Sequence, residues 1–206
     1  MTTGTYSALS SYSRVQILHT LQKRGRRTIA DLRDATGLHA NTVREHLQRL
    51  IDGGYIIVET EQRTTRGRPR ALYSAASGAA TPSPIAQRKA REAAERGDLM
   101  RRIMPETGTT ALPTEAVHQI DALVEDLASA GFDPALDESS LSVDISPCPH
   151  ADADAAQRET LCAVHLTLMD GVLSHAGGPL EVTGMVPSCN PSDCVVQLRF
   201  GRPGSR

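Results

Sequence analysis

The first third of the chain contains three segments whose apolar residues recur every three or four positions, which is the period of an amphipathic helix. They span residues 11–24, 28–36 and 39–52. Each segment is followed directly by glycine, the residue that most often ends a helix. Thr28, with Asp31 three positions later, predicts a capped start for the second helix. The pattern therefore predicts three successive helices.

β-Branched residues follow the third helix. Residues 55–60 are rich in them, and residues 70–74 can pair with this stretch across a polar segment that contains Gly67 and Pro69. Three helices followed by a hairpin is the element order of a winged helix-turn-helix. We therefore expect residues 1–76 to form a winged helix-turn-helix DNA-binding domain.

A connector of Ser, Gly, Ala, Thr and Pro follows the hairpin and leads into a charged helix over residues 85–104. Such a helix is either a solvated spacer or a dimerisation helix. We favour dimerisation, because DNA readers of this type commonly bind as symmetric dimers. Residues 77–112 are accordingly predicted to be a linker and a dimerisation helix.

The remaining residues, 113–206, mix helical periodicity with short alternating segments. Helices are expected over residues 114–130 and 153–175, and strands over residues 141–146, 180–183 and 194–200. We predict a small α+β domain here, so the fold class of the whole chain is α+β.

Charge supports this division of the chain. The formal net charge of -2 is the sum of +6 over residues 1–76, +2 over residues 77–112 and -10 over residues 113–206. A basic segment indicates a polyanionic partner. Aromatic residues make up only 3% of the chain, which disfavours base stacking on single strands and leaves duplex DNA as the better partner.

Other classes of protein are disfavoured. There is no run of about 18 apolar residues that would span a membrane. The first residues lack the basic start and apolar run of a secretory signal. The sequence contains no phosphate-binding loop or nucleophile elbow. We expect a cytoplasmic protein that is not an enzyme and has no membrane partner.

The third helix would be the DNA-reading helix, with its outward side chains reaching base edges or phosphates. Arg44 suits guanine and Asn41 suits adenine, because their side chains match those base edges. The arginine-rich hairpin tip suits a narrow minor groove. We therefore expect DNA contacts from Asn41, Thr42, Arg44, His46, Arg49, Arg66, Arg68 and Arg70.

This part of the chain resembles the bacterial winged-helix repressors of the broad ArsR and MarR type. The residues that carry the resemblance are 13–18, 28–32, 41–50 and 66–69. The resemblance implies a winged-helix fold and binding to a double-stranded DNA operator.

All four cysteines lie in the acidic part: Cys148, Cys162, Cys189 and Cys194. Their placement beside predicted strands and a helix would allow distant sulfurs to meet at one end of the domain. Thiolates bind zinc, copper(I) and iron–sulfur clusters. The paired Cys-x-x-Cys of a zinc ribbon is missing, which makes zinc the weaker choice, whereas cluster ligands tolerate irregular spacing. A metal-free thiol switch and inert buried cysteines remain as alternatives.

The acidic part also resembles the sensor domain of the iron–sulfur-sensing repressors of the SUF cluster-assembly operon. The likeness rests on Cys148 followed by proline, Cys162 about a helix later, and Cys194 before the last strand. It implies that these three hold a cluster, 4Fe–4S in preference to 2Fe–2S, and that the cluster-bound form represses. Cys189 competes for the last position, and His165, three residues after Cys162, is a candidate fourth ligand.

These observations predict a homodimeric transcriptional regulator, by resemblance a repressor, whose operator affinity is controlled by an iron–sulfur cluster that senses redox state, nitric oxide or cluster supply. The alternative is a winged-helix repressor that responds to thiol oxidation, zinc or a small ligand without a cluster.

Overall fold

The computed structural model describes residues 11–61, 69–76, 83–104, 111–148, 151–186, 190 and 192–201. The chain divides into two compact units, Met1–Ile85 and Ala86–Arg206. The charged helix, which we expected between two domains, lies almost entirely in the second unit. Among the described residues, no helix is both long and apolar enough to cross a bilayer.

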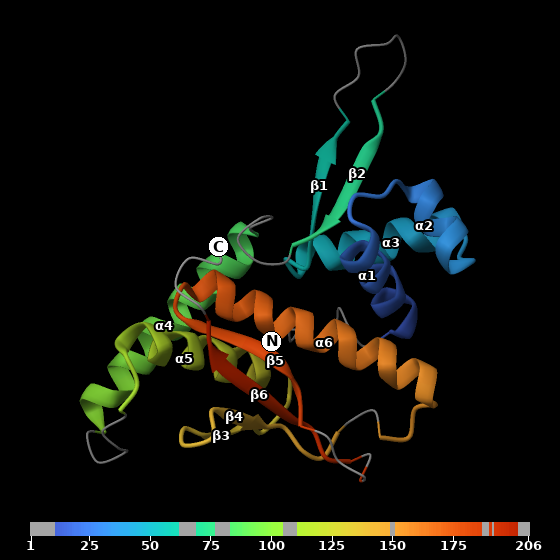
Figure 1. Ribbon diagram of the computed structural model, residues 1–206. Coiled ribbons are helices and arrows are strands. Elements are labelled where there is room, and N and C mark those ends of the chain that lie inside the picture. The colour runs from blue at the N-terminus through green and yellow to red at the C-terminus, as the bar shows by residue number, and fades with distance from the viewer. Residues whose placement is uncertain are drawn as a thin grey trace. The chain divides into compact units, whose positions relative to one another are not determined.

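The first unit contains three helices followed by an antiparallel hairpin that projects away from them (Figure 1). The elements are α1 (Tyr12–Arg24), α2 (Ile29–Thr36), α3 (Ala40–Asp52), β1 (Ile56–Thr60) and β2 (Ala71–Ala75). Fully buried side chains from every helix meet β1 in one small core. Its largest members are Ile17, Leu18, Leu21, Leu32, Leu47, Leu50 and Ile56.

Local signals set the boundaries of α2. The Thr28 hydroxyl accepts the Asp31 N–H, and the Asp31 carboxylate accepts the Thr28 N–H at 2.8 Å, so the predicted capping box is present. Gly37 ends the helix in the left-handed conformation at φ 71°. Arg27, just before α2, exchanges two backbone hydrogen bonds with Tyr73 of β2 and so ties the hairpin to the helices.

The second unit is a four-stranded antiparallel sheet with helices, in the strand order β3-β4-β6-β5. Its elements are α4 (Pro84–Ile103), α5 (Thr114–Ser129), β3 (Ala135–Asp137), β4 (Ser142–Asp144), α6 (Ala155–Ala176), β5 (Leu180–Met185) and β6 (Val195–Phe200). The short strand β3 was not expected from the sequence. With the winged helix-turn-helix before it, this unit confirms the predicted α+β class.

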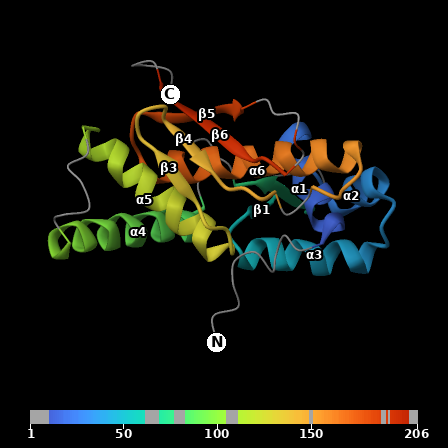
Figure 2. The same cartoon turned by 90° about the horizontal axis from the view of Figure 1, so that it is seen from below.

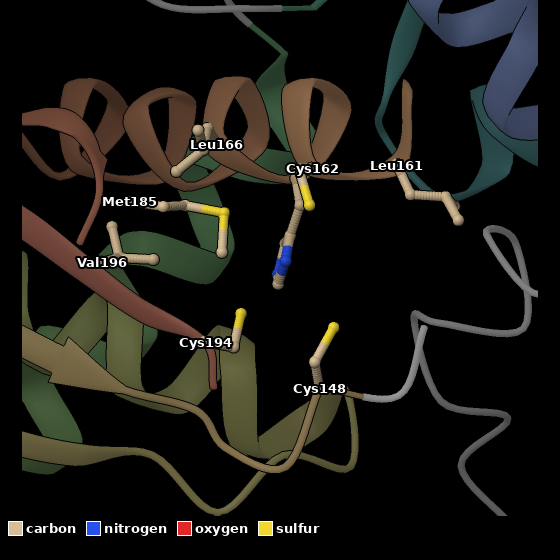
Figure 3. Close-up of a pocket in the computed structure, with 8 residues that line it drawn as sticks. Cys148, Leu161, Cys162, Leu166, Met185, Cys194 and Val196 are labelled. Carbon is tan, nitrogen blue, oxygen red and sulfur yellow. The ribbon is translucent and has the colours of Figure 1, made fainter. Parts of the chain in front are cut away.

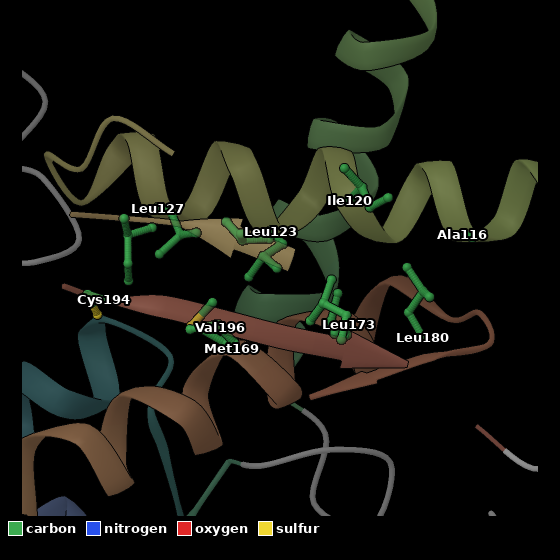
Figure 4. Packing of buried hydrophobic residues seen from close by; sticks show 12 residues of the cluster. Ala116, Ile120, Leu123, Leu127, Met169, Leu173, Leu180, Cys194 and Val196 are labelled. Atoms are coloured by element: carbon green, nitrogen blue, oxygen red, sulfur yellow. The ribbon is translucent and has the colours of Figure 1, made fainter. Parts of the chain in front are cut away.

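The core of the second unit lies between its sheet and the helices α5 and α6 (Figure 4). In β6, Val196 and Leu198 are buried whereas Arg199 is exposed, so only one face of the strand meets the helices. From the helices, Leu123 and Leu173 are fully buried against this face. The sheet, α5 and α6 therefore form two layers.

Helix α4 packs beside α5, as Figures 1 and 2 both indicate. Its buried Ala90 and Ala93 contact Ala122 of α5. Near the other end, the Arg101 guanidinium donates two hydrogen bonds of 2.8 Å to the Asp121 carboxylate. One face of α4 is thus already covered within the unit.

Candidate functional site

The outward face of α3 carries two of the predicted base-reading residues side by side. Asn41 and Arg44 are exposed, and Arg44 Nη1 donates a hydrogen bond of 2.7 Å to Asn41 Oδ1. Thr42 is half-buried beside them, and Arg49 is exposed one turn from the helix end. This face offers an amide and two guanidinium groups, which are groups suited to base edges and phosphates.

His46 lies differently from our expectation of an outward side chain. It is half-buried, and its Nδ1 is buried with no hydrogen-bond partner among the described residues. Burial, together with the positive charges of Arg14 and Arg49, lowers the pKa of His46 below its usual value.

At the hairpin, Arg70 is exposed and its carbonyl accepts the Glu61 N–H at 2.8 Å, which extends the strand pairing towards the tip. The predicted contacts Arg66 and Arg68 lie outside the described residues. On β1, the Glu59 carboxylate forms a salt bridge with the Arg26 guanidinium, with 2.9 Å between Oε2 and Nη2.

In the second unit, three cysteines from distant parts of the chain line one pocket. Cys148 follows β4, Cys162 lies on α6, and Cys194 precedes β6. Figure 3 shows their sulfur atoms directed into the same space. The fourth cysteine, Cys189, lies outside the described residues.

Backbone hydrogen bonds hold two of these cysteines near each other. The Cys194 N–H donates to Ser146 Oγ at 2.9 Å, and the Cys148 N–H donates to the Ser192 carbonyl at 2.7 Å. The Ile145 N–H donates to the Cys194 carbonyl at 2.9 Å. The segment after β4 is therefore fastened to the start of β6, which places Cys148 and Cys194 in the same pocket.

The rest of the pocket is mainly apolar. Its other lining residues are Leu161, His165, Leu166, Met185 and Val196. Burial, reinforced by the neighbouring Cys148, raises the pKa of Cys162 and raises that of Cys194 to about 12. Both thiols are consequently protonated at neutral pH, and a cation that binds them has to displace their protons.

The pocket is not a ready-made site for one metal ion. Across the described ranges, no three or more His, Cys, Asp or Glu side chains lie close enough together to hold a single ion. Sequence reasoning found the cysteines and His165, but it missed Met185 and the fastening residue Ser146. Ser146 stands two residues before Cys148, but its partner is 48 positions away in the chain, so no local pattern could have indicated its role.

The three helices, the hairpin and the exposed polar face of α3 define a winged helix-turn-helix. Residues 11–57 match the family described as winged helix-turn-helix DNA-binding. The N-terminal unit therefore contains a winged helix-turn-helix of the DNA-binding kind.

A solved structure from Mycobacterium bovis is similar at 23% identity, over 52% of this chain and 84% of that one, with a TM-score of 0.30. It is a homodimeric winged helix-turn-helix DNA-binding domain, described as a possible ArsR-family transcriptional regulator. No curated protein matches the chain.

Proposed function

We propose that this protein is a transcriptional regulator that binds an iron–sulfur cluster through Cys148, Cys162 and Cys194, and that the presence of the cluster sets its affinity for a DNA operator. The observation that carries the proposal is that these three cysteines, on three separate segments, line one pocket. The two states would differ in operator affinity through a coupling free energy between the sensor site and the DNA-reading face.

The chemistry of the donor set fits such a cluster. Each cysteine would bind a different iron of the cluster, so the three sulfurs would not need to meet at one point as they would around zinc. A bound 4Fe–4S cluster would supply a centre that oxidants or nitric oxide attack. The apolar side chains of Leu161, Leu166, Met185 and Val196 would limit access of water to it.

The protein would act as a homodimer. At the end of α4, Leu99 and Ile103 are 54% and 65% exposed, and Met100 and Met104 are exposed beside them. Residues four apart lie on one helix face, so these four form a single apolar patch. A second copy that covers this patch would pair the two DNA-reading units, as palindromic operators require.

Ile103→Glu tests the dimer. It should convert the dimer to a monomer in light scattering, because it places a charge in the proposed contact. Val58→Glu is the matched control, since Val58 is a 49% exposed apolar residue on β1. If both variants form dimers to the same extent as the unaltered protein, the patch is not the interface.

The cluster is tested by purification without oxygen. The protein should be brown and contain iron and acid-labile sulfide, and its operator affinity should change after the cluster is removed. Single replacements of Cys148, Cys162 and Cys194 by Ser should each reduce the bound iron. Cys189→Ser is the matched control and should retain it.

Two results would contradict this assignment. If Cys189→Ser loses the cluster and Cys194→Ser keeps it, Cys189 is the third ligand. If the purified protein contains no iron and binds its operator unchanged when all three cysteines are Ser, the protein senses no cluster.

A metal-free thiol switch is the second candidate, and it is favoured because Cys148 and Cys194 line one pocket on segments that hydrogen bonds join. A peroxide would take two electrons and two protons from this pair, leaving a disulfide, and the peroxide would be reduced. Peptide mapping of the oxidised protein, prepared without iron, should then find Cys148 bonded to Cys194. An unbonded pair under these conditions would eliminate this candidate.

A further inference from the structure

Three cysteines leave one coordination position of a four-iron cluster open to another ligand. Eight of the described residues line the pocket, and among these only His165 and Met185, besides the cysteines, have a side-chain atom that can bind iron. The geometry points to His165: we propose that its imidazole is the fourth ligand. This inference rests on the proposed cluster and specifies how the same site is completed.

The position of His165 on α6 suits this role. It follows Cys162 by three residues, so the two side chains lie on the same face of the helix, one turn apart. Both line the pocket that Cys148 and Cys194 close from the other side. One helix would therefore provide two ligands, and the segments after β4 and before β6 would provide the other two.

The ring of His165 is also oriented by its surroundings. Phe132, which follows the end of α5, stacks on it with ring centroids 5.3 Å apart and an interplanar angle of 21°. Such a stack restricts rotation of the imidazole. A ligand held in place before binding loses less conformational entropy when it binds.

Met185 is the competing donor, but its chemistry suits the position less well. A thioether is a weak acceptor on a flexible side chain, whereas imidazole is an established ligand for iron. Imidazole is also neutral, so three thiolates and one histidine carry one negative charge fewer than four thiolates. In iron–sulfur centres, replacing cysteine by histidine raises the reduction potential.

The direct test is pulsed EPR on the reduced holoprotein, prepared with isotopically labelled histidine. The spectrum should contain nitrogen hyperfine coupling from a bound imidazole. His165→Ala should abolish this coupling while the three-cysteine site still holds iron. His175→Ala is the matched control, because His175 lies on the same helix with its ring at the Gly171 carbonyl, and it should leave the coupling unchanged.

A second measurement uses the reduction potential. His165→Cys should lower the potential of the cluster, since a fourth thiolate adds negative charge, and Met185→Leu should leave the potential and the nitrogen coupling as they are. Circular dichroism of each variant without the cluster checks that it still folds.

The outcomes separate this inference from the proposed function. A protein that binds iron and sulfide but shows no nitrogen coupling refutes His165 as a ligand and leaves the cluster intact. Loss of cluster signals in Met185→Leu or Cys189→Ser, with unchanged spectra in His165→Ala, assigns the position to that residue instead. Absence of iron and sulfide from the unaltered protein overturns both the proposed function and this inference.

Discussion

Gln119 shows how much a single buried polar side chain contributes to the second unit. It is fully buried, and its Nε2 donates to the carbonyls of Leu173 and Leu180 at 2.9 and 3.0 Å. Its Oε1 accepts the Leu180 N–H at 2.7 Å. One amide thus joins α5 to the end of α6 and the start of β5. The sequence could not predict this role, because both partners lie more than 50 positions away.

Gln119→Leu should lower the free energy of unfolding by about 1–3 kcal/mol, since it leaves the buried Leu180 N–H without its acceptor and removes a hydrogen bond from the Leu173 and Leu180 carbonyls. Urea unfolding monitored by circular dichroism measures the change. Gln87→Leu, at an exposed position of α4, is the control and should change stability by less than about 0.5 kcal/mol. Similar losses in both variants would contradict the role of Gln119.

Asp137 stabilises the turn between β3 and β4. Its carboxylate accepts hydrogen bonds from the Ser139 hydroxyl at 2.6 Å and from the Ser139 and Ser140 N–H groups. These bonds, the Ser139 hydroxyl first, lower the pKa of Asp137 to about 2. The pKa of Asp in the unfolded chain is about 3.9, so this stabilisation is complete above that pH and is lost as pH falls towards 2.

Asp137→Ala should therefore be less stable than the unaltered protein at neutral pH, and the difference should narrow as pH falls from about 4 to about 2. Asp137→Asn keeps an acceptor oxygen without a titrating group, so its difference from Asp137→Ala should not vary with pH. Denaturant titrations at several pH values measure both. A difference between Asp137→Ala and the unaltered protein that is constant over this range would count against the carboxylate as the cause.

At the scale of elements, the helices were predictable because their signals are local. The capping box at Thr28 and the glycines after the helices lie within a few residues of the ends that they define. Strand β3 has only three residues and pairs with β4, so it depends on tertiary contacts that a pattern cannot supply. The sequence allowed a shared cysteine pocket but could not predict it. Cys162 and Cys194 line the same pocket only once α6 and the start of β6 have packed together.

The contact between α4 and α5 depends on a glycine in the middle of a helix. A Cβ added at Gly97 would overlap Oδ2 of Asp121, the carboxylate that accepts two hydrogen bonds from Arg101. In an isolated helix, Gly→Ala stabilises by about 1 kcal/mol. Here the same change should destabilise, because it pushes Asp121 away from its two hydrogen bonds.

Gly97→Ala should therefore lower the melting temperature of the protein. In a variant that already carries Asp121→Ala the obstruction is gone, so the added methyl should be neutral or stabilising. Comparing the two backgrounds is a double-mutant cycle that isolates the contact. A melting temperature that rises in both backgrounds would show that α4 does not need this close approach.

At the scale of the whole molecule, charge and chemistry are divided between the two parts of the chain. The net charge of +6 over residues 1–76 accompanies the DNA-reading helix, and the -10 over residues 113–206 accompanies all four cysteines. The overall value of -2 would by itself have argued against a nucleic-acid partner. The acidic part should be repelled by the duplex, which would leave the winged helix to make the contacts.

This division predicts where the salt dependence of operator binding originates. Replacing Arg66 and Arg68 by Ala should weaken binding and reduce the slope of log affinity against log salt by about 0.9 for each phosphate that the protein no longer neutralises. Replacing Arg102 and Arg199, two exposed arginines outside the winged helix, removes the same charge and should leave the slope unchanged. Fluorescence anisotropy at several salt concentrations measures both slopes. If both double variants reduce the salt slope equally, binding depends on the net charge of the protein. If only the replacement of Arg66 and Arg68 reduces it, these two arginines contact phosphates.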